Sequence, residues 1–139
     1  MIVKFCVYGT PVAKGRPRVS TKNGFARTYT PKDTVMYENL VRYTYQSDVG
    51  GKIDGAIEMS CKFYFPIPKS ISKKQRAILL TEKEPHLKKP DTDNCIKSLC
   101  DGLQGVAFDD DKQIYKIVAE KYYSDNPRVE VELRTRDDL

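Results

Sequence analysis

The sequence predicts one domain of mixed α/β (α+β) class, in which helices pack on a small mixed sheet of about four strands. Three observations lead to this prediction. The 139 residues are enough for one domain, spanning residues 1–139. The composition, 40% hydrophobic and 31% charged, is that of a globular protein. Segments of strand period and helical period follow in the order strand, helix, strand, helix, helix, strand, strand.

The first three elements are predicted from the N-terminal half. Apolar side chains alternate over residues 2–8 and predict a strand that ends before Gly9. A polar, basic loop follows. Pro31 suits the first helical position, and apolar residues at helical spacing after it predict a helix over about 31–47. A second alternating stretch, from Ile57 to Phe65, predicts a half-buried strand.

Two helices are predicted next. Ser70 or Ser72 is expected to cap a short helix, and residues 82–92 are expected to form a loop. Apolar residues at i, i+3, i+4 and i+7 from Ile96 to Leu103 then predict a helix that begins near residues 91–93.

The last two strands are predicted from residues 115–119 and 129–133. A turn-like stretch, Ser124 to Pro127, separates them, so we expect an antiparallel hairpin of neighbouring strands. The first two strands are joined through a helix, which allows them to run parallel.

Several classes of protein and site are excluded. No apolar run approaches the roughly 18 residues of a membrane span, so we expect a soluble, cytoplasmic protein without a membrane partner. The four cysteines form no CxxC pair and there is one histidine, which argues against a zinc site. Neither a Walker loop nor GxGxxG occurs, so no nucleotide cofactor is expected.

Two basic segments are candidate DNA-binding surfaces. The net charge is +5 and the pI is near 9.0, which suits a polyanionic partner. Basic residues cluster between Thr10 and Lys32 without any acid, and again between Lys69 and Pro90. Such runs are also common as plain solvated surface. The candidate residues are Lys14, Arg16, Arg18, Lys22, Arg27, Lys73, Lys74, Arg76, Lys88 and Lys89.

Acidic residues gather at Asp91 and Asp93 and again at residues 109–111. Taken alone, the first pair has a plain explanation, because aspartates at a helix start most often cap free N–H groups and face the positive end of the helix dipole. A run of aspartates before a strand is likewise most often a solvated turn.

A metal site is the second explanation of these acids. Asp93, Lys97 and Asp101 fall at i, i+4 and i+8 and therefore share one flank of the predicted helix. Carboxylates brought together repel one another unless a cation neutralises them, and Mg²⁺ takes carboxylate, water and phosphate oxygens. Asp91, Asp93 and one of the three later aspartates would supply such a site if residues 105–112 folded back beside the helix start.

Taken together, the motifs point to a known family. They are the run from Lys89 to Asn94 with Lys97 and Asp101, then Asp110-Asp111 and Gln113-Ile114, preceded by Pro11 to Arg18 and Tyr29-Thr30-Pro31. This set resembles the signature of RusA-type Holliday junction resolvases of bacteria and their prophages. The similarity runs from about residue 5 to residue 133.

The resemblance implies a homodimeric, Mg²⁺-dependent endodeoxyribonuclease, with Mn²⁺ as an alternative ion. Such an enzyme binds four-way DNA junctions by shape and resolves them by paired symmetric nicks in recombination and repair. By this resemblance Asp91, Asp93 and Asp111 match the metal-binding acids and Lys97 matches the catalytic lysine. Asp110 is expected to ligate or support the metal, although Asp109 beside it leaves open which carboxylate faces the ion.

Two other functions remain open from the residues. A non-catalytic, structure-specific DNA- or RNA-binding protein would use the basic segments and keep the acids as helix caps. A nuclease of similar chemistry would act on flaps or replication forks.

Overall fold

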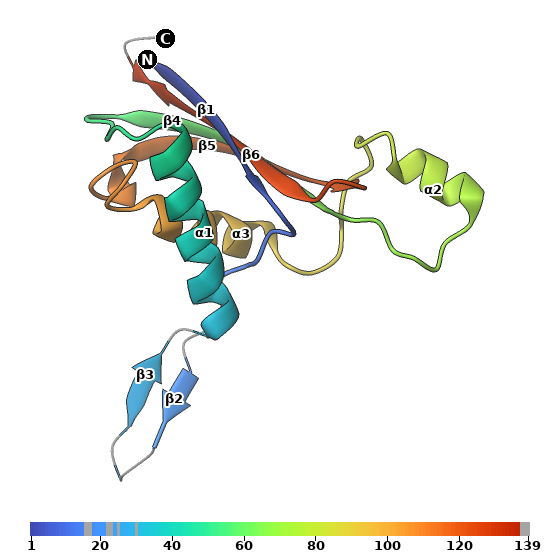
Figure 1. The fold of residues 1–139 in the computed structure, drawn as a ribbon, viewed down its shortest axis with the longest axis horizontal. Helices are drawn as coiled ribbons and strands as arrows, with labels where there is room; N and C mark the ends of the chain where they lie inside the picture. Colours follow the sequence, from blue (N-terminus) through green and yellow to red (C-terminus); the bar gives the residue numbers. More distant parts are fainter. Residues whose placement is uncertain (16–17, 22–23, 25, 30, 137–139) are drawn as a thin grey trace.

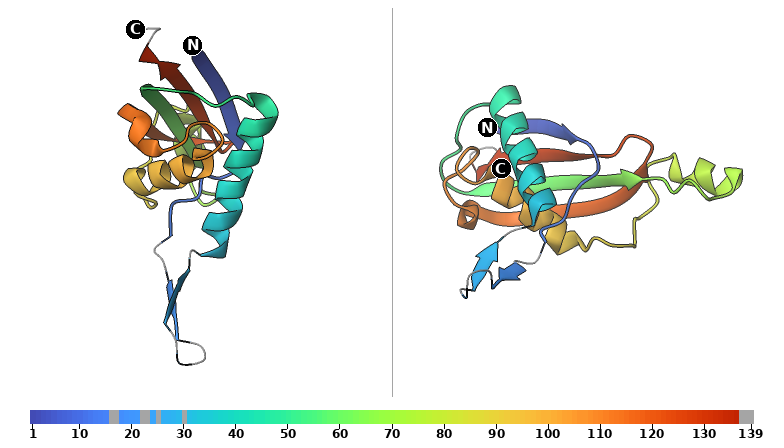
Figure 2. Two further views of the ribbon diagram at one scale, coloured as in Figure 1. Left: turned by 90° about the vertical axis from the view of Figure 1, so that its left-hand side faces the viewer. Right: turned by 60° about the horizontal axis from the view of Figure 1, so that its bottom comes forward.

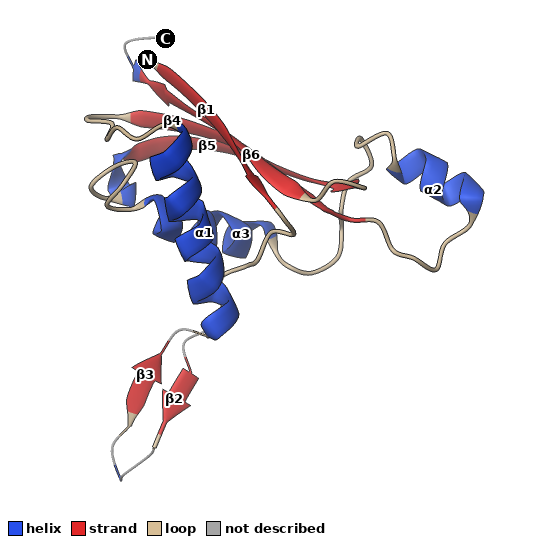
Figure 3. Ribbon diagram, viewed as in Figure 1, coloured by secondary structure: helices blue, strands red, loops and turns tan. Residues whose placement is uncertain are grey.

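The structure, a computed structural model, describes residues 1–15, 18–21, 24, 26–29 and 31–136. Its centre is a four-stranded mixed sheet with the strand order β1-β6-β4-β5 (Figures 1 and 3). The strands are β1 (Ile2–Tyr8), β4 (Ile57–Pro66), β5 (Ile114–Ser124) and β6 (Arg128–Thr135). The predicted mixed α+β class is thus confirmed.

The pairing of the last two strands differs from the prediction. β6 pairs antiparallel with both β1 and β4, whereas β5 pairs parallel with β4. The predicted hairpin is therefore wrong, because β4 lies between β5 and β6. Residues 125–127 cross the end of β4, a step of two strand spacings, or about 10 Å, which a few extended residues span. β1 and β4 run in the same direction, with β6 between them.

Two helices cover one face of this sheet (Figure 2). They are α1 (Lys32–Asp48) and α3 (Thr92–Leu103). Both elements turn their apolar sides to the sheet, since the regular spacing of apolar residues gives each helix one buried stripe. The core they enclose includes Val41, Tyr45, Ile57, Met59, Phe63, Cys95, Leu99, Leu103, Val129 and Leu133. No helix in the described part of the chain is long and apolar enough to cross a membrane.

Two further elements project from the sheet and its helices (Figure 1). One is a two-stranded ribbon of β2 (Arg18–Ser20) and β3 (Arg27–Tyr29), where the sequence predicted only a loop. Strands of three residues are too short to leave a periodic signal in the sequence. The other is an arm, residues 67–83, that carries α2 (Lys73–Leu79) beyond the end of β4.

The arm has a defined cap and a defined base. Of the two predicted capping serines, Ser72 is the cap, and its hydroxyl accepts a hydrogen bond from the Gln75 N–H at 3.1 Å. At the base, the Arg128 guanidinium lies 2.9 Å from the Glu82 carboxylate and 4.0 Å from the centroid of the Tyr64 ring. The arm is therefore tied to β6 and β4 by a half-buried ion pair and a cation–π contact.

Candidate active site

The start of α3 is held against the extension of β1. The Lys14 N–H donates to the Asn94 carbonyl at 2.9 Å, and the Ser98 hydroxyl donates to the Val12 carbonyl at 2.6 Å. These bonds tie residues 12–14 to the first two turns of α3. The orientation of the helix start is therefore set by a segment distant in sequence.

Asp91 is the N-cap residue of α3, but its side chain does not act as a cap. Its backbone is extended (φ −67°, ψ 147°) and its carbonyl accepts from the Cys95 N–H at 3.1 Å. The carboxylate makes no capping hydrogen bond, and the side chains of Asp91 and Asp93 are exposed. Aspartate is common at this position because its carboxylate caps the helix, but the Asp91 carboxylate does not cap α3.

The three later aspartates have three different surroundings. Asp109 lies 2.6 Å from the Lys52 ammonium. Asp110 caps the 3₁₀ turn Asp111–Gln113 by accepting from the Lys112 N–H at 2.9 Å, and this backbone hydrogen bond lowers the pKa of its carboxyl. Asp111 instead faces α3, with its carboxylate 3.9 Å from the Lys97 ammonium.

A hollow of about 180 Å³ joins Asp111 to α3. It is lined by Asp93, Ile96, Lys97, Cys100, Asp111, Ile114 and Ile117. Residues 105–112 thus fold back beside the helix, the arrangement on which the predicted metal site depends. Two carboxylates from segments far apart in the sequence flank one lysine in this hollow.

The number of acidic side chains at this hollow suits a hydrated divalent ion. Within the described residues, no three or more His, Cys, Asp or Glu side chains are grouped closely enough to form a metal cluster. Mg²⁺, however, usually keeps several waters and uses one or two protein carboxylates. A hydrated Mg²⁺ of this kind suits Asp93 and Asp111 in the hollow. Asp91, whose carboxylate makes no capping hydrogen bond, lies at the adjacent helix start.

Lys14 lies in an ion-pair network that links α1 to α3. Its ammonium is 3.1 Å from the Glu38 carboxylate and 3.0 Å from that of Asp101, whose other oxygen is 3.3 Å from Lys97. Burial alone would lower the pKa of Lys14, but the hydrogen bonds with Asp101 and Glu38 outweigh it and raise that pKa. The sequence predicts that Lys14 contacts DNA. In the structure its side chain is 22% exposed and its ammonium binds two carboxylates of the protein.

The other predicted DNA contacts that the structure describes lie on the arm, on the ribbon and just before Asp91. Exposed side chains are found at Lys73 and Lys74 on α2, and at Lys88 and Lys89 just before Asp91. Arg76 is half-buried and donates to the Pro68 carbonyl at 3.2 Å. Arg18 begins β2 and Arg27 begins β3, whereas Arg16 and Lys22 lie outside the described residues.

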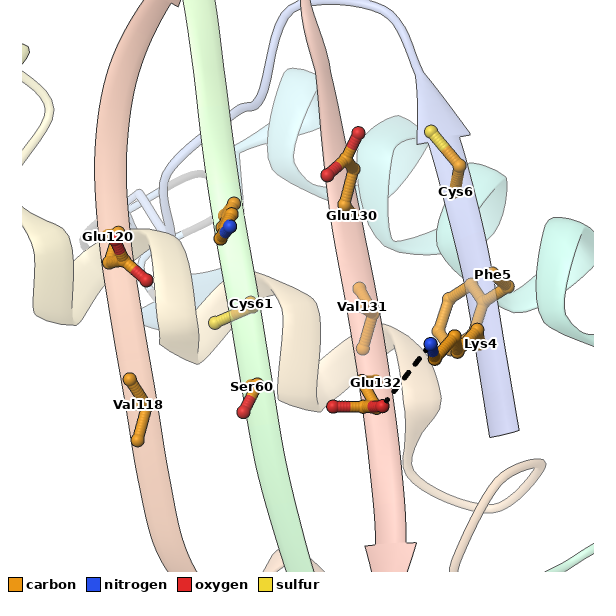
Figure 4. Close-up of a pocket in the computed structure, with 11 residues that line it drawn as sticks. Lys4, Phe5, Cys6, Ser60, Cys61, Val118, Glu120, Glu130, Val131 and Glu132 are labelled. Carbon is orange, nitrogen blue, oxygen red and sulfur yellow. Dashed lines mark ion pairs between the residues drawn. The ribbon is translucent and has the colours of Figure 1, made fainter. Parts of the chain in front are cut away.

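A larger hollow, of about 600 Å³, lies elsewhere. It is on the open sheet face, opposite α1 and α3, and contains none of the predicted site residues (Figure 4). Lysines and glutamates alternate across it, including an ion pair of 3.7 Å between Lys4 and Glu132. Its size therefore does not identify it as the site, since Asp93, Lys97 and Asp111 line the smaller hollow beside α3 on the other face.

Sequence reasoning missed Lys121. This residue pairs with Phe63 in the β4–β5 register, so it belongs to the helix-covered face of β5. A lysine in the alternation Ile117, Ala119, Lys121 is the signal that could have identified it, because long charged side chains are seldom placed toward a core without a role.

Comparison with known proteins gives two results. Residues 8–134 match the family described as Endodeoxyribonuclease RusA. The chain is also 38% identical over 136 residues to a Bacillus subtilis (strain 168) protein named Uncharacterized protein YqaN, and the match covers 95% of both chains. Both matches extend over the whole of the hollow and the segments that form it.

Proposed function

The chain belongs to the RusA endodeoxyribonuclease family, and on this premise we propose that it is a Mg²⁺-dependent nuclease that resolves four-way DNA junctions by paired nicks. The hollow shared by Asp93, Lys97 and Asp111 is the observation that carries the proposal. We further propose that it acts as a homodimer, because a four-way junction presents strands related by a pseudo-two-fold axis.

In this proposal Asp91, Asp93 and Asp111 hold the ion in part through its water molecules, because no three acidic side chains of the described residues lie close enough to ligate it directly together. When bound, Mg²⁺ would lower the pKa of an attacking water and neutralise phosphate charge. Lys97 is exposed enough to reach a phosphate (54%) and is oriented by Asp101 and Asp111. Its ammonium would stabilise the negative charge that develops in the transition state.

The neighbouring residues keep this set in place. Asp110 caps the turn that presents Asp111, so we assign it a supporting role rather than a ligand role. Glu38 and Lys14 fix Asp101, the partner of Lys97. The exposed lysines of α2 and of the segment before Asp91 would draw the DNA toward carboxylates that otherwise repel phosphate.

The test compares the wild-type protein with Asp93→Asn. Labelled four-way junction, linear duplex, flap and fork DNA are incubated with each protein in Mg²⁺ or EDTA, and binding and cleavage are scored separately. The wild-type protein is expected to make paired, metal-dependent nicks in the junction, and Asp93→Asn to bind it without cutting. Asp109→Asn is the matched control, since Asp109 pairs with Lys52 outside the hollow.

Each alternative predicts a different result. Junction binding without cleavage under any divalent ion would contradict the nuclease and favour a binding protein whose acids only shape the helix start. Cleavage of flaps or forks in preference to junctions would keep the chemistry and reject the proposed substrate.

A further inference from the structure

The segment that leads into α3 rests on Lys121 of β5. The ammonium donates hydrogen bonds to the Lys88 carbonyl at 2.8 Å and to the Pro90 carbonyl at 2.5 Å. It also lies 5.6 Å from the centroid of the Phe65 ring. Two backbone carbonyls and one aromatic ring, from two different parts of the chain, thus surround the Lys121 ammonium.

The backbone around Lys121 binds the same segment. The His86 N–H donates to the Lys121 carbonyl at 3.0 Å, and the Tyr123 N–H donates to the Glu84 carbonyl at 3.4 Å. The return from the arm, residues 84–90, is therefore fixed first by strand-like bonds and then by the lysine side chain. The second carbonyl that the ammonium binds, that of Pro90, is joined directly to Asp91.

The positive charge of Lys121 has no acidic partner among the described residues, because no carboxylate forms an ion pair with it there. It lies beside the start of α3, where the helix dipole is also positive. A lysine bound only by carbonyls and a ring keeps its field available to nearby anions. The carboxylates of Asp91 and Asp93 follow directly in the chain after Pro90, whose carbonyl this ammonium binds.

We propose that Lys121 is a positioning residue of the active site, which holds the Lys88 and Pro90 carbonyls so that Asp91 and Asp93 are presented to the metal ion. This inference rests on the proposed nuclease function. Residues that orient metal ligands without touching the ion commonly change metal affinity by about 10–100-fold when removed. Lys121 therefore acts through metal affinity rather than through contact with DNA.

The experiment compares Lys121→Met with Lys121→Arg. Methionine keeps an apolar side chain beside Phe65 and removes the charge and its donors, whereas arginine keeps both. Mn²⁺ affinity is measured by titration of the protein without DNA, and junction cleavage is measured across Mg²⁺ concentrations. Lys116→Met is the matched control, because Lys116 is also on β5 but pairs with Glu58 on the open face.

We expect Lys121→Met to weaken Mn²⁺ binding and to raise the Mg²⁺ concentration for half-maximal cleavage, each by about 10–100-fold. Junction binding in EDTA should be unchanged, and Lys121→Arg should recover most of the affinity. A purely structural role would instead lower the fraction of folded protein without altering the metal dependence of the folded part.

Two results would overturn the inference. One is a folded Lys121→Met variant with wild-type Mn²⁺ affinity and Mg²⁺ dependence, while the wild-type protein cleaves; this rejects the role of Lys121 alone. The other is a wild-type protein that neither binds Mn²⁺ nor cleaves, which rejects the proposed function as well. If Lys121→Met does not fold, Lys121→Leu, which also lacks the donors, is measured instead, and wild-type values for that variant count against the inference.

Discussion

Gly102 of α3 lies against α1 with no room for a side chain, so Gly102→Ala tests how tightly these helices are packed. A Cβ atom at this position would lie 2.8 Å from the Val41 Cβ and 2.9 Å from the Glu38 carbonyl oxygen. Carbon atoms in contact prefer about 3.5–4.0 Å, so the two helices would have to separate by roughly 0.5–1 Å. A backbone carbonyl cannot yield by changing rotamer.

The expected cost follows from two opposing contributions. Overpacking a close contact destabilises by about 1–3 kcal/mol. Alanine returns about 1 kcal/mol through its better helix propensity. Because one of the clashing atoms is backbone, we expect the upper part of this range, a net loss of about 1–2 kcal/mol. The separation would also stretch the ion pairs between Lys14, Glu38 and Asp101, so cleavage should fall too.

Urea unfolding followed by circular dichroism measures this loss. With an unchanged slope, the midpoint of Gly102→Ala should fall by roughly 0.5–1 M. Gly51→Ala is the control, since a Cβ there meets no atom within 4 Å and the residue does not have positive φ. If Gly102→Ala unfolds at the wild-type midpoint or above it, the close-packing argument is refuted.

Three further predictions concern His86, Ser72 and Asp91. Burial lowers the pKa of His86, so on acidification the imidazole of the unfolded chain takes up a proton, near pH 6.5, before that of the folded protein does. The free energy of unfolding should therefore be fully retained above about pH 6.5 and decline as the pH falls below it. An equal decline in His86→Phe would contradict this reasoning. Ser72→Ala should remove about 1 kcal/mol from the stability of α2, measured by amide exchange, because its hydroxyl is a cap. Asp91→Ala should change the free energy of unfolding by less than about 0.5 kcal/mol, because the Asp91 carboxylate makes no capping hydrogen bond. The same variant should abolish cleavage. A loss of stability near that of Ser72→Ala would show that the Asp91 carboxylate caps α3 in solution.

Local patterns were sufficient to predict most elements. The apolar spacing of α3 and the alternation in β1 and β4 depend on the period of each element, which is a property of neighbouring residues. The position of β6 between β1 and β4 is not local. Every strand alternation is compatible with several partners, and the hairpin between β5 and β6 was predicted only because they follow one another in the chain.

The candidate site shows the same difference between features that depend on neighbouring residues and features that depend on the fold. The aspartates themselves could be singled out from the sequence, but not the different surroundings of Asp109, Asp110 and Asp111. Those depend on Lys52, on the turn that follows and on α3, which only the fold brings near. Lys14 was grouped with the DNA contacts by its basic neighbours, although its partners come from α1 and α3.

The place of β4 in the middle of the sheet has a consequence for biosynthesis. Both of its partners, β5 and β6, come from residues 114–135, which are synthesised some fifty residues or more after β4 begins. While the ribosome is still making the C-terminal part, β4 has neither neighbour, and its apolar residues have no completed sheet to join. Folding dominated by such distant pairings is slow and leaves strand edges open to aggregation. Within this sheet the last strand to be synthesised is thus the one that joins β1 to β4, so a truncation before residue 128 would leave β1 without its partner strand.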